Sequence, residues 1–146
     1  EIGFVFQGYN LIQELDALEN VTLPLIYRGV PAWDREDMAL DALARVGMED
    51  RAHHRPGEMS GGQQQRVAIA RAIAAKPPII MADEPTGALD SKTGKQVLGI
   101  LQELYREGTT VLLITHDDHI AATAPRVVRL SDGHIISDAP QEVDWI

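Results

Sequence analysis

Residues 60–66 form the first of three segments whose residue types and spacing suit phosphate chemistry. Ser60 and Gln63 have the spacing of a capping box and predict the start of a helix. Gly61 and Gly62 follow Ser60, although glycine destabilises a helix by roughly 1 kcal/mol relative to alanine. Bare N–H groups at the positive end of a helix let a phosphate approach closely. An ordinary cap built from poor helix formers is the alternative, and this motif alone does not decide.

The second segment combines an apolar run with two adjacent acids. Residues 79–82 are all apolar and are followed by Asp83, Glu84 and Pro85. Ligands of α/β proteins bind beyond the carboxyl ends of the strands. Asp83 suits Mg²⁺, held directly or through water, and Glu84 could polarise an attacking water as a general base. A strand that ends in solvated acids and a turn is the alternative, but the apolar run favours the functional interpretation.

The third segment follows another apolar run, residues 110–114. His116 comes directly after it and could contact a phosphate or an attacking water, although a single histidine there is more often a polar strand end. The i, i+3 spacing of His116 and His119, with Asp117 and Asp118 between them, also suggests a metal site. No further residue supplies a third ligand at matched spacing, so the spacing does not favour a metal site.

The elements that must position these segments alternate between strands and helices. Apolar runs predict buried strands at 2–6, 79–82 and 110–114, and the run at 79–82 is typical of a strand covered on both faces of a parallel sheet. Helical spacing predicts helices within 19–26, at 38–46, at 60–75, after Asp90 and near 117–124. Pro24 limits the regularity of the first of these helices. The dipeptide Asp132-Gly133 predicts a hairpin turn. The pattern predicts an α/β fold with a mostly parallel sheet and an inserted helical block.

Composition excludes several classes of protein. The chain has 146 residues, 45% of them apolar, which suits a single domain with a real core. No cysteine is present, so disulfides and thiolate metal sites are excluded. A net charge of −9 argues against binding to nucleic acid or anionic lipid. No apolar run approaches the roughly 18 residues of a membrane span. We therefore expect a soluble, cytoplasmic protein.

Taken in order, these segments resemble the motifs of the ATP-binding cassette (ABC) ATPases over nearly the whole chain. Residues 59–63 resemble the signature motif, with Met59 where leucine is usual. Residues 79–84 resemble Walker B with its catalytic glutamate, and residues 87–90 resemble the D-loop. His116 falls at the switch histidine and Gln7 at the Q-loop glutamine.

Three longer stretches of the sequence are similar to one branch of that family. Residues 6–12, 17–21 and 83–90 resemble the ATP-binding subunits of macrolide exporters, lipoprotein-releasing systems and exporters of antimicrobial peptides. This resemblance implies a bacterial or archaeal ABC transporter with a partner protein in the membrane, a P-loop NTPase fold, and ATP with Mg²⁺ as cofactors.

The resemblance also implies a role for each motif. Two such domains pair head to tail, so that the signature of one faces the γ-phosphate of a nucleotide held by the other. The residues that would bind the nucleotide or couple the two sites are Ser60, Gly61, Gly62, Gln63 and Asp90. The catalytic set would be Glu84 for the attacking water, His116 for the γ-phosphate and Gln7; the Mg²⁺ set would be Asp83 and Gln7.

One family motif has no counterpart. The Walker A loop, G-x-x-x-x-G-K-[ST], is missing; Gly94-Lys95 is followed by Gln96, has Ser91 at the earlier glycine position and lies early in a predicted helix. The family's adenine-stacking aromatic residue and antiparallel β-subdomain precede the Q-loop. We therefore expect an incomplete cassette, with a helical subdomain at about 15–75 and RecA-like core parts at 1–8 and 76–146. This chain alone should neither bind MgATP tightly nor hydrolyse it.

Partners follow from the resemblance. We expect a second ATPase domain and a transmembrane permease subunit, which would place the chain at the inner face of the cell membrane, and no nucleic acid. One alternative is a non-transport ABC ATPase, but such proteins usually carry coiled-coil, zinc or basic insertions. Another is a non-catalytic fragment that docks through its helical block.

Overall fold

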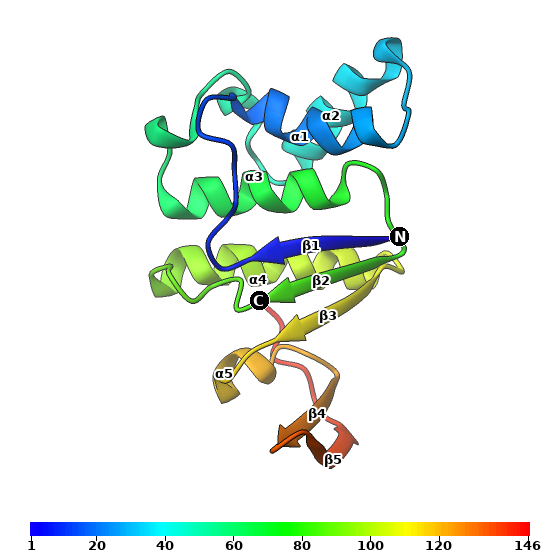
Figure 1. The fold of residues 1–146 in the computed structure, drawn as a ribbon. Helices are drawn as coiled ribbons and strands as arrows, with labels where there is room; N and C mark the ends of the chain where they lie inside the picture. The colour runs from blue at the N-terminus through cyan, green and yellow to red at the C-terminus, as the bar shows by residue number, and fades with distance from the viewer.

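The computed structural model describes residues 1–146 (Figure 1). Its strands and helices, in chain order, are β1 (Ile2–Phe6), α1 (Ala17–Tyr27), α2 (Ala32–Arg45), α3 (Gly61–Ile73), β2 (Ile79–Asp83), α4 (Ser91–Arg106), β3 (Thr110–Ile114), α5 (Asp118–Ala121), β4 (Arg126–Ser131) and β5 (His134–Pro140). Two single 3₁₀ turns, Glu49–Arg51 and Pro56–Glu58, lie between α2 and α3. No helix is both long and apolar enough to cross a membrane.

The strands form two separate sheets. β1, β2 and β3 form a parallel sheet with β2 in the centre, in which Phe6 pairs with Asp83 and Asp83 with Ile114. β4 and β5 form an antiparallel hairpin. Its turn is the predicted Asp132-Gly133, where both residues have positive φ, as a two-residue hairpin turn requires. The predicted α/β class with a parallel sheet is confirmed.

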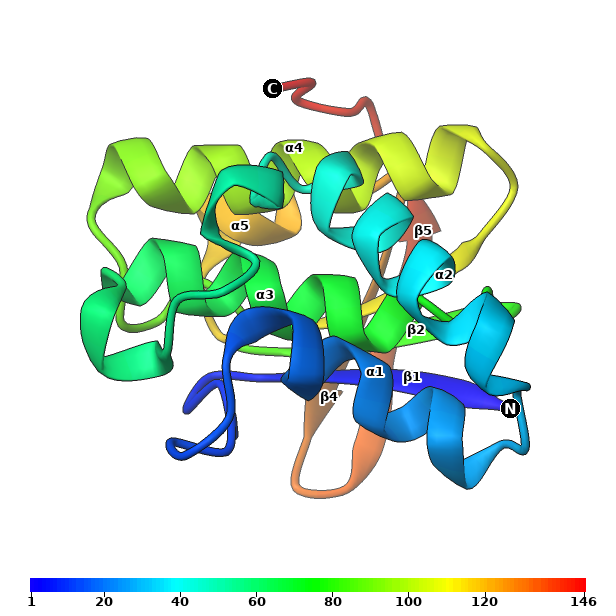
Figure 2. The ribbon, with the colours of Figure 1, turned by 90° about the horizontal axis from the view of Figure 1, so that it is seen from above.

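Helices cover one face of the parallel sheet. α3 packs against β1, α4 packs against β3, and the two helices contact each other; α1 and α2 then pack on α3 (Figure 2). The covered face buries Val5, Ile80 and Ala82 completely or nearly so, within a cluster of 24 buried apolar residues.

The opposite face of the sheet is uncovered, and in Figure 1 no helix lies in front of these strands. Phe4 is 45% exposed and Leu112 is 48% exposed, while Ile79 and Met81 are half-buried. The prediction that 79–82 is covered on both faces is therefore wrong for residues 1–146. The reason is that α3 and α4 lie on the same side of the sheet.

Local signals explain where the helices begin. Asp16 caps α1 and forms a capping box with Glu19, and Ser60 does the same for α3 with Gln63. α1 continues through Pro24 without interruption, so the proline does not limit this helix. Gly47 follows the end of α2 at φ +71°, a conformation that favours glycine.

Gly3 lets β1 approach α3 closely. A Cβ atom at Gly3 would lie 2.6 Å from Cδ1 of Ile80 and 2.7 Å from the carbonyl oxygen of Ala72. We expect Gly3→Ala to lower the free energy of unfolding by about 1–3 kcal/mol in urea titrations, as overpacking does. Gly57→Ala is the control, since a Cβ there meets nothing within 4 Å. Equal midpoints for the two variants would contradict this account.

Candidate functional site

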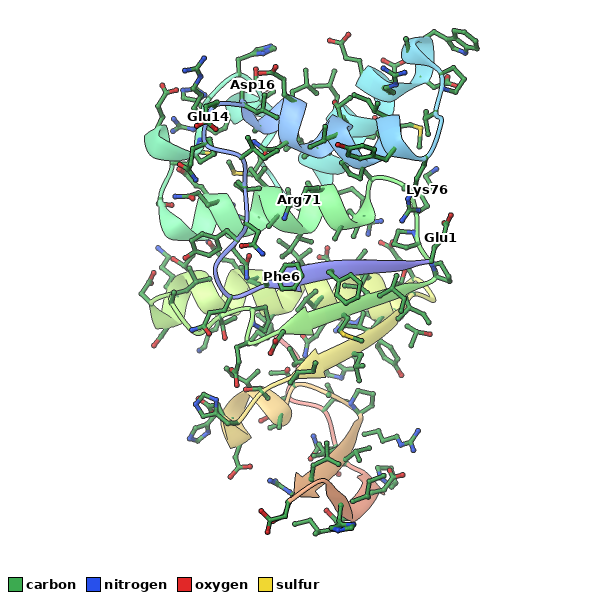
Figure 3. All side chains as sticks on the ribbon, viewed as in Figure 1. Glu1, Phe6, Glu14, Asp16, Arg71 and Lys76 are labelled. Atoms are coloured by element: carbon green, nitrogen blue, oxygen red, sulfur yellow. The ribbon has the colours of Figure 1, made fainter.

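The three parallel strands end at one edge of the sheet. Because Phe6, Asp83 and Ile114 are paired in register, the residues that follow them meet at this edge. In Figure 3 the label Phe6 marks the carboxyl end of β1. Gln7, Glu84 and His116 are thus brought to the same side of the molecule, as the sequence predicts.

Glu84 is fixed to the loop after β3. Its backbone N–H donates to the carbonyl of Ile114, at 2.8 Å, and its φ is +44°, an uncommon value for a residue with a side chain. Its Oε1 accepts from the backbone N–H of His116 at 2.8 Å and is hydrogen-bonded to Nδ1 of the same histidine. Its Oε2 accepts from the hydroxyl of Thr115 at 3.2 Å.

These contacts favour the ionised form of Glu84. Burial alone would raise the pKa of this carboxyl group, but the hydrogen bonds and charge of His116, together with the bond from Thr115, outweigh it and hold the pKa below its usual value. Glu84 is therefore ionised at neutral pH, as a general base requires. Because the folded-state pKa is the lower one, the resulting stabilisation is present above the usual pKa of glutamate. It is lost as the pH falls through the lowered value.

Gln7 lies against the turn that follows Glu84. A Cβ atom at Gly87 would lie 2.4 Å from Nε2 of Gln7, so a side chain at this position would displace the amide of Gln7. Asp83, at the end of β2, is exposed at the same edge. Carboxylate and amide oxygens suit Mg²⁺, so the two residues fit the predicted metal role. No group of three acidic or histidine side chains is close enough to hold a metal alone, so phosphate oxygens would have to complete the coordination.

The start of α3 forms the second part of the candidate site. The hydroxyl of Ser60 accepts from the N–H of Gln63 at 3.2 Å, and Oε1 of Gln63 accepts from the N–H of Ser60 at 3.0 Å. The predicted capping box is confirmed. The N–H groups of Gly61 and Gly62 donate to no acceptor in the chain and stand at the positive end of the helix.

A side chain added at either of these two glycines would meet other atoms of the chain. A Cβ atom at Gly62 would lie 1.9 Å from Cγ2 of Thr93, and one at Gly61 would lie 2.7 Å from the hydroxyl oxygen of Tyr9. The sequence suggests that glycine makes room for a phosphate. Here that room is occupied by Thr93 and Tyr9, while the free N–H groups remain available.

Asp90 caps α4 beside the start of α3. Its carboxylate accepts from the backbone N–H of Thr93 at 3.3 Å, and hydrogen bonding from the side chain of Thr93, followed by that from its backbone, holds the pKa of Asp90 below its usual value. Gly94 and Lys95 lie in the first turns of α4, as predicted, and not in a loop between a strand and a helix. No hydrogen bond or ion pair joins residues 60–63 to Asp83, Glu84 or His116, so the candidate site has two separate parts.

Comparison with known proteins accounts for this arrangement. Residues 1–87 match the protein-family model described as ABC transporter. The chain belongs to this family. Its fold is that of an ABC ATPase. The dimeric structure of a post-hydrolysis state of the ATP-binding cassette MJ0796, bound to ADP and Pi, superposes with a TM-score of 0.82 and 48% identity. The match covers 96% of this chain and 62% of that one.

Curated relatives of the chain are ATP-binding/permease proteins. The chain is 57% identical over 136 residues to the macrolide export ATP-binding/permease protein MacB 1/2 of Paracoccus denitrificans, covering 93% of this chain and 20% of the relative. It is 52% identical over 141 residues to MacB of Bartonella henselae, covering 97% of this chain and 21% of the relative. The chain therefore spans about a fifth of the length of these relatives.

One buried residue of this ABC chain is absent from the sequence-based predictions. Gln65, on α3, is completely buried, and its Nε2 donates to the carbonyls of Phe6 at 3.1 Å and Pro85 at 2.6 Å. It thereby joins the segments that carry Gln7 and Glu84. Its i, i+4 spacing to buried Ile69 is a signal that could have found it.

We expect Gln65→Leu to destabilise the fold, because leucine leaves the carbonyl of Pro85 without a donor and leaves the carbonyl of Phe6 only the 3.3 Å bond from the N–H of Tyr9. An unpaired buried polar group costs about 1–3 kcal/mol, so the loss in urea unfolding should be of that order or larger. Gln64→Leu on the same helix is the control, since Gln64 donates only one long bond, 3.3 Å, to Met59. Equal losses in the two variants would rule out this role for Gln65.

Proposed function

We propose that this chain is the ATP-hydrolysing part of an ABC transporter and that hydrolysis is coupled to export or to remodelling of a membrane complex. The observation that carries this is the pairing of Glu84 with His116 at the carboxyl edge of the sheet, beside Asp83 and Gln7. The identity to MacB proteins supports the transporter assignment and favours macrolide-type export.

In this proposal Glu84 takes the proton of the attacking water. A carboxylate has about four acceptor positions, and His116 and Thr115 occupy up to three of them, which leaves one directed acceptor for that water. His116 would then stand beside the γ-phosphate. Asp83 and Gln7 would hold Mg²⁺, and MgATP supplies the phosphoryl group that is transferred.

Residues 60–63 would act on the nucleotide of a second ATPase domain, paired head to tail. The two free N–H groups and the helix dipole at the start of α3 support this role, and MJ0796 was solved as a dimer. Asp90, which caps the neighbouring helix, would couple the two sites. A net charge of −9 disfavours nucleic acid as a partner.

The membrane partner would be a permease at the inner face of the membrane. The helical subdomain, taken as residues 15–75, and the loop after Gln7 would pass closure on to it, while residues 1–8 and 76–146 would form the RecA-like core. α3 contacts α1, α2 and β1, and this supports its place between the two parts.

Calorimetric titration with MgATP tests the proposal. We compare residues 1–146 with an extended cassette, defined as this chain preceded by a segment that supplies a Walker A loop. Asp83 and Glu84 would repel a nucleotide, and the Walker A backbone and lysine normally compensate its charge. We expect no tight binding to residues 1–146 and stoichiometric binding, with hydrolysis, in the extended cassette. An extended cassette that neither binds nor hydrolyses ATP would contradict the proposal, whereas equal tight binding to both would contradict the expectation that residues 1–146 lack the phosphate site.

A further inference from the structure

Arg71, on α3, is bonded to the loop that follows Gln7. Its Nη1 donates to the carbonyl of Asn10 at 2.6 Å and its Nη2 donates to the carbonyl of Tyr9 at 2.9 Å. Figure 3 shows this segment of the chain passing α3 on its way from Phe6 to Glu14, with Arg71 on the helix. One guanidinium therefore holds two consecutive carbonyl groups.

The loop needs such support because its backbone is strained. Tyr9 has φ +64° and Asn10 has φ +55°, so two neighbouring residues with side chains lie in the left-handed region. Each such residue costs of order 1 kcal/mol and persists only where the surroundings fix it. The fork of an arginine can hold both carbonyl oxygens at once, which a single ammonium group does less well.

Arg71 has no competing partner. It is half-buried, burial lowers its pKa, and it forms no ion pair with a carboxylate. The two loop carbonyls are the only acceptors of its side chain. Arg71 is a half-buried charge, and all its side-chain hydrogen bonds go to one strained loop. We therefore infer that its structural role is to hold this loop.

Two further contacts join the same stretch of chain to α3. Nε2 of Gln65 donates to the carbonyl of Phe6, directly before Gln7, and the hydroxyl of Tyr9 lies over Gly61 in the first turn of the helix. α3 therefore holds residues 6–10 at its beginning, its middle and its second half.

We propose that Arg71 is a positioning residue that fixes residues 7–10 to α3, so that Gln7 and the capped start of α3 move as one rigid body. A displacement of α3 by a nucleotide at residues 60–63 would then carry Gln7 with it. The link itself rests on geometry, whereas its effect on Mg²⁺ rests on the proposed function of Gln7.

Arg71→Met in the extended cassette tests this inference with two readouts. In hydrogen exchange, the amides of Tyr9, Asn10 and Ile12 should exchange faster, while amides in the middle of α3 should not change. In ATP hydrolysis, the Mg²⁺ concentration for half-maximal rate should rise roughly tenfold, as for the loss of hydrogen bonds to a charged group, with the maximal rate retained. A merely structural role would lower the melting temperature and the active fraction without moving the Mg²⁺ dependence.

Two other variants complete the design. Arg45→Met removes an exposed ion pair to Glu107, far along the sequence from the loop, and should change neither readout. Arg71→Lys keeps the charge without the fork and should give an intermediate result; it replaces Arg71→Met if that variant does not fold.

Unchanged exchange at Tyr9 and Asn10 in a folded Arg71 variant would overturn the inference, as would an unchanged Mg²⁺ dependence in an active one. If the unsubstituted extended cassette does not hydrolyse ATP, the proposed function fails, and the exchange result alone decides whether Arg71 holds the loop.

Discussion

Glu84→Gln in the extended cassette should abolish ATP turnover and leave MgATP binding intact. A glutamine has the size of the glutamate but cannot take a proton from water. General-base catalysis contributes about 10²–10⁴-fold to a rate, and we expect a loss of that order. Phosphate release gives the turnover, and calorimetry gives the affinity.

The contacts around Glu84 explain why the variant should still fold. His116 donates to one carboxylate oxygen and Thr115 to the other. A glutamine keeps an oxygen for the backbone N–H of His116, and its NH₂ group can donate to the hydroxyl of Thr115, which also accepts. Glu107→Gln, at an exposed ion pair, is the matched control and should retain turnover. Turnover near the unsubstituted rate in Glu84→Gln would refute the role of general base.

Features set by neighbouring residues could be predicted from the sequence. Ser60 and Gln63 fix the start of α3 through two bonds within four residues, and Asp132-Gly133 fixes the hairpin through its own backbone conformation. The strand ends that bring Glu84 and His116 together also follow from local patterns, because carboxyl ends of adjacent parallel strands share one edge.

Features set by packing between distant segments could not be predicted in this way. The run at 79–82 is apolar on both faces, yet only the side on which α3 and α4 both lie is covered. In the sequence Gln65 is one of three consecutive glutamines. Only the fold shows that it reaches Phe6, 59 residues away, and Pro85, 20 residues away. Spacing within a helix cannot show which carbonyls a side chain will meet.

The glycines at 61 and 62 are the case in which sequence and structure give different reasons for the same residues, and Gly62→Ala separates them. Its methyl group would lie 1.9 Å from Cγ2 of Thr93, so the side chain of Thr93 must rotate or α3 and α4 must move apart at the start of both helices. We expect a stability loss of about 1–3 kcal/mol, as for overpacking. Because the N–H groups of residues 61 and 62 would move with α3, turnover of the extended cassette should fall as well.

Thr93→Ser removes Cγ2 and leaves the backbone N–H that Asp90 accepts from. The nearest remaining atom of residue 93 to the new methyl group is then Cβ, at 3.3 Å, a contact that needs only a small shift. If glycine is required for packing, Gly62→Ala combined with Thr93→Ser should regain both stability and turnover, since alanine keeps its N–H. Regained stability without turnover would mean that a nucleotide needs the bare glycine itself. Urea unfolding and phosphate release, measured on both single variants and the double variant, distinguish the two outcomes.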